Sequence, residues 1–312
     1  MSRLGEIISL VVAISWTFSA WFADKASRRI GSMVTNVIRL ALAAVFLAAL
    51  LWITTGHPYP AFADARAWQW LALSALVGYV FGDFCLFNCY VHIGPRFGQL
   101  LMTLAPPSAA IAGYFILGES LTFKSILAMA VTLTGIAISI LSRDAGNHVK
   151  LQLPVKGILL GIGAGIGQGV GLVLSKVGME HYAAALPADA PHAMQVMLPF
   201  ASTLIRAIVG FAGFFALLAM QKGLGRLVSG IKDRKGMKYA TLLTIFGPAV
   251  GVSLSLMAVQ YADAGIASTL MALTPVLIIA PDVIINKKKI FLRELIGIAV
   301  TMLGVCLFFL YR

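Results

Sequence analysis

Acidic residues are scarce in this sequence, which has 12 Asp and Glu against 24 Lys and Arg in 312 residues. Charged residues of both signs make up only 12% of the chain, whereas a soluble domain carries about 25%. Hydrophobic residues make up 60%. This composition excludes an ordinary soluble domain and indicates a protein surrounded by lipid.

Cysteine and histidine are also few, with three and five residues. Cys85, Cys89 and Cys306 lie inside apolar stretches, so we expect small packed side chains rather than a disulfide framework. The histidines lack the spacing of metal ligands, and no cofactor is expected. No Gly-Lys-Ser/Thr loop is present, which argues against ATP-driven activity of this chain alone. No Ser, Cys or His constellation indicates hydrolysis, so no enzyme is expected.

Long apolar runs are what the sequence has in abundance. A membrane-spanning helix needs about 20 largely apolar residues. Ten stretches qualify, namely 4–23, 32–55, 68–90, 97–117, 122–141, 154–177, 194–220, 239–260, 265–285 and 291–311. The sequence therefore predicts an all-α integral membrane protein with ten transmembrane helices, and any function must lie within or between them.

A block near the middle of the chain returns near its end. The run that starts at Gly82 lies without a gap over the run that starts at Gly251, 169 positions later, and Met102 then matches Met271. We expect a first five-helix repeat at 1–143, a linker at 144–156 and a second repeat at 157–312. Because five is odd, the copies enter the membrane in opposite directions and form an inverted repeat. Such repeats usually build a pathway at their interface, so transport is the leading function.

The lysine and arginine residues follow the odd-numbered stretches far more often than the even-numbered ones. By the positive-inside rule these loops are cytoplasmic and both termini lie outside. The basic residues therefore mark loops facing one side of a bilayer, and no nucleic-acid partner is expected.

Three features together resemble the EamA-type branch of the drug/metabolite transporter superfamily. They are ten helices in two repeats, a Gly-Glu step at residues 117–122 (LGESLT), and a proline in the fourth helix of each repeat, Pro106 and Pro275. The resemblance implies a multi-pass carrier of the inner (cytoplasmic) membrane for small metabolites such as amino acids, which works by alternating access and often as an exporter. Residues 287–289 are lysines where the Gly-Glu step should recur. Family members usually have cytoplasmic termini, so the orientation stays open.

Charged side chains inside apolar spans cost at least about 2.5–3.5 kcal/mol and are functional hypotheses. Arg39 and Asp83 are two such residues, and Arg206 is the repeat mate of Arg39. In the functional interpretation, Arg39 holds a substrate carboxylate and Asp83 accepts a substrate amine or a coupling proton. In the alternative, Arg39 and Asp83 form a buried ion pair. For Arg206 a structural role is favoured, because the second repeat has Val252, and no carboxylate, at the position equivalent to Asp83.

Aromatic and amide side chains complete the predicted cavity. Tyr79 and Tyr90 share a helical face with Asp83, and Trp16 has Gln168 as its repeat mate. The predicted substrate-binding residues are Trp16, Arg39, Tyr79, Asp83, Tyr90, Gln168 and Arg206, with Asp83 also the coupling residue.

Glycine and proline indicate where helices bend. Glycines occupy every second position from 161 to 171, and Gly165 and Gly167 lie in the middle of this run. They allow either close helix packing or a bending gate. Pro106 and Pro275 offer further hinges, since a proline removes a backbone hydrogen bond.

Several alternatives stay open at this point. Amino acids or related metabolites lead as substrates, and lipophilic cations, handled by a multidrug exporter, come second. A membrane-embedded enzyme and a sensor that binds a metabolite without moving it are further alternatives. The driving force would be a gradient, such as that of protons, and the carrier would work as a monomer or a homodimer.

Overall fold

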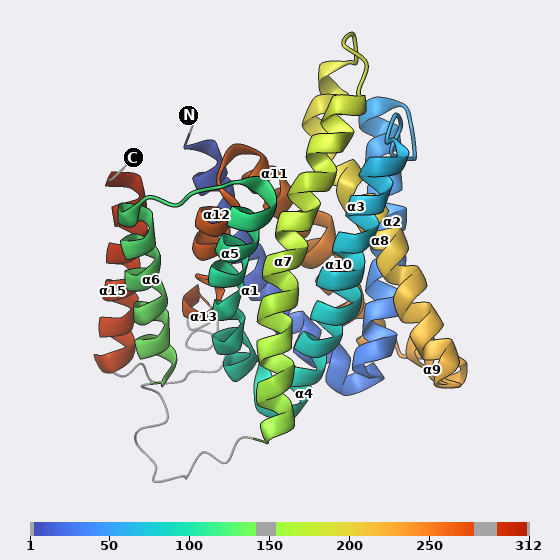
Figure 1. Ribbon diagram of the computed structural model, residues 1–312. Helices are drawn as coiled ribbons and strands as arrows, with labels where there is room; N and C mark the ends of the chain where they lie inside the picture. Colours follow the sequence, from blue (N-terminus) through green and yellow to red (C-terminus); the bar gives the residue numbers. More distant parts are fainter. Residues whose placement is uncertain (1–2, 142–153, 278–291, 311–312) are drawn as a thin grey trace.

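The computed structural model describes residues 3–141, 154–277 and 292–310, and these residues form helices and connecting loops without a strand (Figure 1). In the first half the α-helices are α1 (Leu4–Ile30), α2 (Ser32–Thr55), α3 (Ala65–Ala75), α4 (Phe84–Leu101), α5 (Ala105–Leu117) and α6 (Phe123–Leu141). In the second half they are α7 (Val155–Ala185), α8 (His192–Met220), α9 (Leu224–Lys232), α10 (Arg234–Thr244), α11 (Ser253–Tyr261), α12 (Ala264–Met271), α13 (Thr274–Leu277) and α15 (Leu292–Leu310).

Six helical segments within the described ranges are long and apolar enough to cross a membrane. They are Leu4–Ile30, Ser32–Thr55, Ala65–Pro95, Val155–Ala185, His192–Met220 and Arg234–Tyr261. Shorter apolar helices cover Met102–Leu117, Phe123–Ile138 and Leu295–Gly304. An all-helical, multi-pass membrane protein is thus confirmed, while the count of ten spans stays a prediction. The expected linker at 144–156 lies largely outside the described residues.

The predicted helix 97–117 is not continuous. Just before this stretch, Gly94 turns the chain with a φ of 83°, a conformation that suits glycine. Within the stretch, the helix tightens to a 3-10 turn at Met102–Leu104 before α5 begins. Pro106 therefore lies in the first turn of α5, where proline breaks no hydrogen bond of the helix. At the repeat-related position, α12 ends at Met271 and α13 begins at Thr274. Pro275 lies in that short helix, so both prolines follow an interruption.

Two π-helical segments occupy equivalent places in the halves. One spans Leu76–Asp83 between α3 and α4, and the other spans Ile245–Val252 between α10 and α11, 169 positions later. π-Helical turns are rare in proteins overall, and those that occur are often at functional sites. Their recurrence is independent structural support for the internal repeat.

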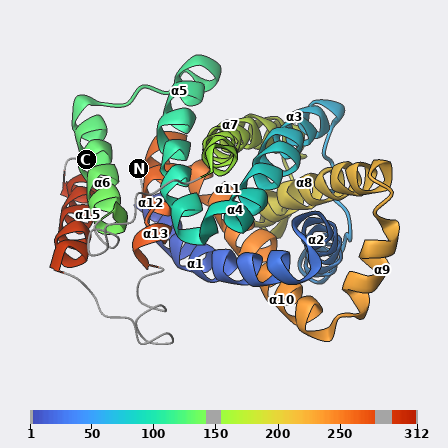
Figure 2. The same cartoon turned by 90° about the horizontal axis from the view of Figure 1, so that it is seen from below.

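The last helices of the two halves pack on each other through matching residues. Helices α6 and α15 run antiparallel along one edge of the molecule (Figures 1 and 2). A side chain added at Gly135 would collide with Thr301, and one added at Gly304 would collide with Thr132. Because Thr301 and Gly304 lie 169 positions after Thr132 and Gly135, the same contact is made twice in opposite directions.

The alternating glycines of α7 pack closely against its neighbours on two sides. An added Cβ at Gly171 would lie 2.8 Å from the Gly78 Cα, and one at Gly165 would lie 2.9 Å from the Leu101 carbonyl oxygen. An added Cβ at Gly167 would lie 3.0 Å from the Gly82 Cα. Helix α7 is unbroken from Val155 to Ala185, so the glycines serve close packing here. Bending at Gly165 and Gly167 remains a prediction.

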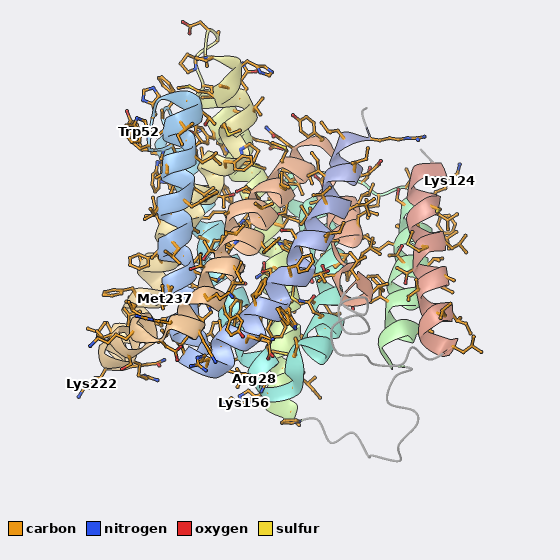
Figure 3. The ribbon with its side chains drawn as sticks, turned by 180° about the vertical axis from the view of Figure 1, so that it is seen from behind. Arg28, Trp52, Lys124, Lys156, Lys222 and Met237 are labelled. Carbon is orange, nitrogen blue, oxygen red and sulfur yellow. The ribbon has the colours of Figure 1, made fainter. Side chains whose placement is uncertain are left out.

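Basic side chains gather at one end of the molecule. Figure 3 shows Arg28, Lys156 and Lys222 there, away from Trp52 and Lys124. Arg29 forms an ion pair with Asp233 at 2.7 Å, and its hydrogen bond lowers the pKa of this exposed carboxyl. At this basic end of the molecule, the ion pair joins the last turn of α1 to the start of α10.

Candidate functional site

Two adjoining hollows lie in the middle of the helix assembly. They contain about 600 and 580 Å³ of empty space, part of it open to solvent. Both are lined by Trp16, Tyr79, Gln99, Met102, Gln168 and Val252, so they form one cavity. Pockets between the helices of a bundle are common places for small-molecule sites.

The cavity walls come from both halves in repeat-related pairs. Trp16 and Gln168, 152 positions apart, both line it, as do Arg39 and Arg206, 167 positions apart. At an offset of 169, the lining pairs are Gln99 with Ser268, Met102 with Met271, Thr103 with Ala272 and Asp83 with Val252. The cavity therefore lies at the interface between the repeats, and all seven predicted substrate-binding residues line it.

Arg39 and Asp83 form an ion pair on one wall of the cavity, and both are buried. The Arg39 Nε donates to Asn36 Oδ1 at 2.8 Å, and the second carboxylate oxygen of Asp83 accepts a hydrogen bond from Gln168 Nε2 at 2.7 Å. Gln168 also donates to the Gly78 carbonyl at 3.0 Å. This is the arrangement that the sequence analysis gave as the alternative to a free anchor, and it leaves neither oxygen of Asp83 without a partner.

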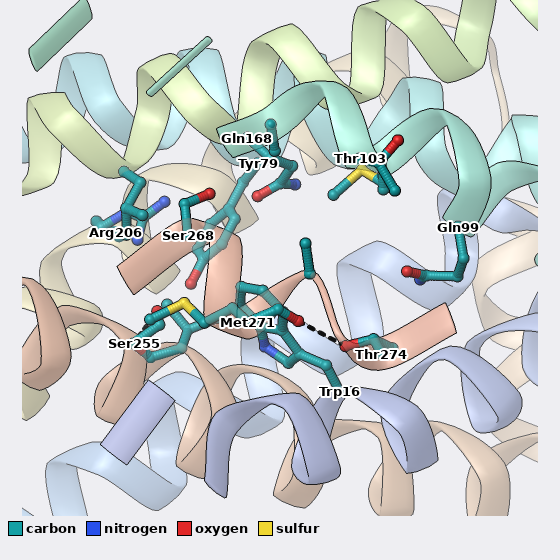
Figure 4. Close-up of a pocket in the computed structure, with 15 residues that line it drawn as sticks. Trp16, Tyr79, Gln99, Thr103, Gln168, Arg206, Ser255, Ser268, Met271 and Thr274 are labelled. Carbon is teal, nitrogen blue, oxygen red and sulfur yellow. Dashed lines mark hydrogen bonds between the residues drawn. The ribbon is translucent and has the colours of Figure 1, made fainter. Parts of the chain in front are cut away.

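Arg206 and Tyr79 form a different arrangement. The Arg206 guanidinium lies over the Tyr79 ring, with its central carbon 4.5 Å from the ring centroid. Gly78 leaves room for it, since a Cβ at that position would lie 2.9 Å from Arg206 Nη2. Both side chains are almost fully buried, yet Arg206 Nε and the Tyr79 hydroxyl have no hydrogen-bond partner among the described residues. Figure 4 shows both side chains at the cavity wall.

Tyr90 lies at the end of the cavity nearer the basic residues. Its hydroxyl accepts a hydrogen bond from Gln99, and its carbonyl accepts one from Arg28 Nη2 at 3.1 Å. The Tyr90 ring therefore lines a wall that the α1 and α4 ends hold in place.

Hydroxyl residues of the second half line the cavity and were missed by the sequence analysis. They are Ser255, Ser268 and Thr274. The Thr274 hydroxyl donates to the Met271 carbonyl at 3.0 Å, next to the interruption between α12 and α13 (Figure 4). Small hydroxyl residues give no signal inside apolar stretches. However, applying the offset of 169 to Gln99 points directly to Ser268.

A second ion pair joins the halves outside the cavity. Lys176 of α7 contacts Glu119, which follows α5, at 2.5 Å, and also donates to the Ala262 carbonyl at 3.3 Å. The other Glu119 oxygen accepts from the Ala264 backbone N–H at 3.0 Å, at the start of α12. We call Glu119 and Lys176 the latch; it lies at the end where α5 stops and α12 begins (Figure 1). The Gly-Glu step thus ties three segments together.

In the described part of the chain, no group of three or more His, Cys, Asp and Glu residues could hold a metal ion.

Comparison with known proteins adds an independent finding. The model of the EamA-like transporter family matches the chain twice, at residues 3–141 and at 155–310. A solved crystal structure resembles the fold with a TM-score of 0.71 at 16% identity, covering 99% of this chain and 97% of the other. None of the curated proteins compared matches the chain. At such low identity the structural likeness shows the fold alone.

Proposed function

The chain belongs to the EamA-like transporter family, and from this premise we propose a secondary-active carrier that moves a small polar metabolite by alternating access. The membrane would be the inner, cytoplasmic one, crossed by ten helices in two inverted five-helix repeats, residues 1–143 and 157–312. Export is the proposed direction, because the family resemblance implies it.

The observation that carries this proposal is the cavity between the repeats. Its walls are contributed in pairs by equivalent positions, such as Trp16 with Gln168 and Met102 with Met271. Inverted-repeat carriers bind substrate at this place, and they expose it to either side as one repeat rocks against the other around the site.

Interrupted helices beside the cavity support the same mechanism. The 3-10 turn Met102–Leu104 and the break between Met271 and Thr274 are repeat-related, and residues of both line the cavity. Broken helices at the substrate site are typical of carriers, because they can change angle without unfolding a continuous helix. Pro106 and Pro275 follow these interruptions and are the proposed hinges.

The cavity favours solutes with both polar and apolar parts. Trp16, Met102 and Leu172 supply apolar surface, and Gln99 and Gln168 supply amides. Amino acids or related metabolites are the first class to test and lipophilic cations the second. The proposed driving force is the proton gradient, with Asp83 as the coupling carboxylate, because protonation would release Arg39 from its ion pair.

Counterflow in proteoliposomes tests this function. Vesicles preloaded with unlabelled amino acids should transiently accumulate a radiolabelled amino acid from outside, and vesicles without the protein should not. Binding without counterflow would indicate a sensor. Chemical conversion of the labelled compound would indicate an enzyme.

A further inference from the structure

The charges on the cavity wall do not cancel. Among the described residues that line it, the charged ones are Arg39, Asp83 and Arg206. Arg39 and Asp83 neutralise each other in their ion pair. Arg206 forms no ion pair within the described ranges, so the described lining carries one net positive charge.

A buried cation without an ion-pair partner is costly, because burial removes water that would otherwise solvate it, and stacking on the Tyr79 ring offsets only part of that cost. Arg206 is 3% exposed and Tyr79 is 2% exposed, so water offers little compensation. The Arg206 Nε and the Tyr79 hydroxyl, which both lack a hydrogen-bond partner in the described part of the chain, belong to side chains in direct contact. Both atoms can donate a proton to a hydrogen bond. Two donors without partners among the described residues and a positive charge without an ion pair thus meet in two side chains that line the cavity.

We propose that Arg206 and Tyr79 form an anion subsite, which holds a carboxylate of the substrate. A carboxylate would accept hydrogen bonds from both donors and neutralise the guanidinium, which removes the cost of leaving them unpaired. This inference rests on the proposed function. It moves the anchor from Arg39, already occupied by Asp83, to its repeat mate.

The same charges argue against a lipophilic cation as substrate. Asp83 is the only carboxylate among the described wall residues, and both of its oxygens accept hydrogen bonds. A cation would therefore meet the repulsion of Arg206 without a free counter-ion. The Ser268 hydroxyl lines the same hollow as Arg206 and is available to the uncharged polar parts of the substrate, whereas the Ser255 hydroxyl, which donates to the Val252 carbonyl at 2.7 Å, can only accept.

The test measures ligand-induced thermal stabilisation of the detergent-purified protein, since a ligand of the native state raises its apparent stability. The probes are matched acids and amides, L-leucine with L-leucinamide, L-phenylalanine with L-phenylalaninamide and benzoate with benzamide, together with tetraphenylphosphonium. The variants are Arg206→Gln, Arg206→Lys and Tyr79→Phe. Lys222→Gln serves as control, because it removes a positive charge from an exposed position.

Acids should stabilise the wild type and Lys222→Gln, and their amides should not. Affinity for the acid should fall about tenfold or more in Arg206→Gln and by a smaller factor in Tyr79→Phe, as expected for lost hydrogen bonds to a charged group. Arg206→Lys should retain part of the binding, which shows that the charge matters and that the site still folds. The absence of any acid among the stabilising probes, or equal binding of acids by Arg206→Gln, would overturn the subsite.

Counterflow distinguishes failure of the subsite from failure of the carrier. Arg206-dependent binding without counterflow supports the subsite and overturns transport. Counterflow of a cation or an amide overturns the subsite and supports transport.

Discussion

Trp16 occupies the space that a side chain at position 251 would need. A Cβ added to Gly251 would lie 2.7 Å from the indole Cδ1. The contact crosses between the repeats, from α1 to the second π-helical segment. Its repeat-related counterpart is Gln168 against Gly82, where an added Cβ would lie 3.2 Å from Nε2. In each half, a glycine of the π segment thus leaves space for a cavity-lining side chain of the other half, Gly251 for Trp16 and Gly82 for Gln168.

Replacing these glycines tests the contact. Gly251→Ala should destabilise the protein by about 1–3 kcal/mol, because the added methyl group also lies 2.6 Å from the Phe246 carbonyl and the rigid indole cannot yield easily. Gly82→Ala should cost less, because its closest contact, 3.2 Å to Gln168 Nε2, is longer than the 2.6 Å contact at Gly251. Thermal unfolding in detergent measures both. Gly225→Ala is the control, since nothing lies within 4 Å of its added Cβ. Equal stability of Gly251→Ala and the control would contradict the packing.

The Arg39–Asp83 pair makes a separate prediction. Asp83→Asn should lower stability by about 3–5 kcal/mol, because it leaves Arg39 buried without a counter-charge. The double variant Arg39→Gln/Asp83→Asn removes both charges and should regain much of the loss. A double variant no more stable than Asp83→Asn would show that Arg39 and Asp83 do not contribute jointly to stability.

Transport assays separate structure from coupling at Asp83. If Asp83 carries the coupling proton, flux driven by a pH gradient should vanish in the double variant while exchange of substrate at equal pH continues. Exchange at equal pH is the internal control, since it needs a folded carrier but no net proton movement. Proton-driven flux that survives would make Asp83 structural.

The repeat explains which parts of the fold and the site could be predicted. The offset between Gly82 and Gly251 and the apolar stretches identified an all-helical, two-repeat membrane protein from the sequence. All predicted binding residues line the cavity, because charged and aromatic residues stand out in an apolar background.

The sequence left the partners of these residues undecided. It allowed Arg39 either to pair with Asp83 or to hold substrate, and the structure shows the pair. The position of Tyr79 beneath Arg206 was not predicted, because Arg39 and Arg206 stand at equivalent sequence positions. The prolines indicated bending near these places, but the interruptions themselves, at Met102–Leu104 and after Met271, were not predicted, since each precedes its proline within an apolar stretch.

The latch should control access to the cavity from its end of the molecule. Glu119→Ala removes the contacts to Lys176 and to the Ala264 N–H, and should cost about 1.5–3 kcal/mol in unfolding free energy. Glu119→Gln keeps an acceptor for Ala264 and should cost less. A cysteine introduced at Ser268, in a background without the native cysteines, should react faster with a membrane-impermeant thiol reagent when Glu119 is Ala. An unchanged labelling rate would show that the latch contributes to stability but does not control access to the cavity.

The prolines after the two interruptions provide the test of hinge motion. Pro106 and Pro275 lie in the first turns of α5 and α13, where a proline lacks an N–H that the helix does not need. Their replacement by Ala should therefore leave stability within about 1 kcal/mol of wild type. It would also supply the N–H groups with which the chain could form one continuous helix across each interruption. A continuous helix bends less readily, so turnover in counterflow should slow several-fold while substrate affinity changes little. Pro154→Ala, at the exposed start of α7, is the matched control. Turnover that is equal in the hinge variants and this control would place the movement elsewhere, with Gly165 and Gly167 as the next positions to replace.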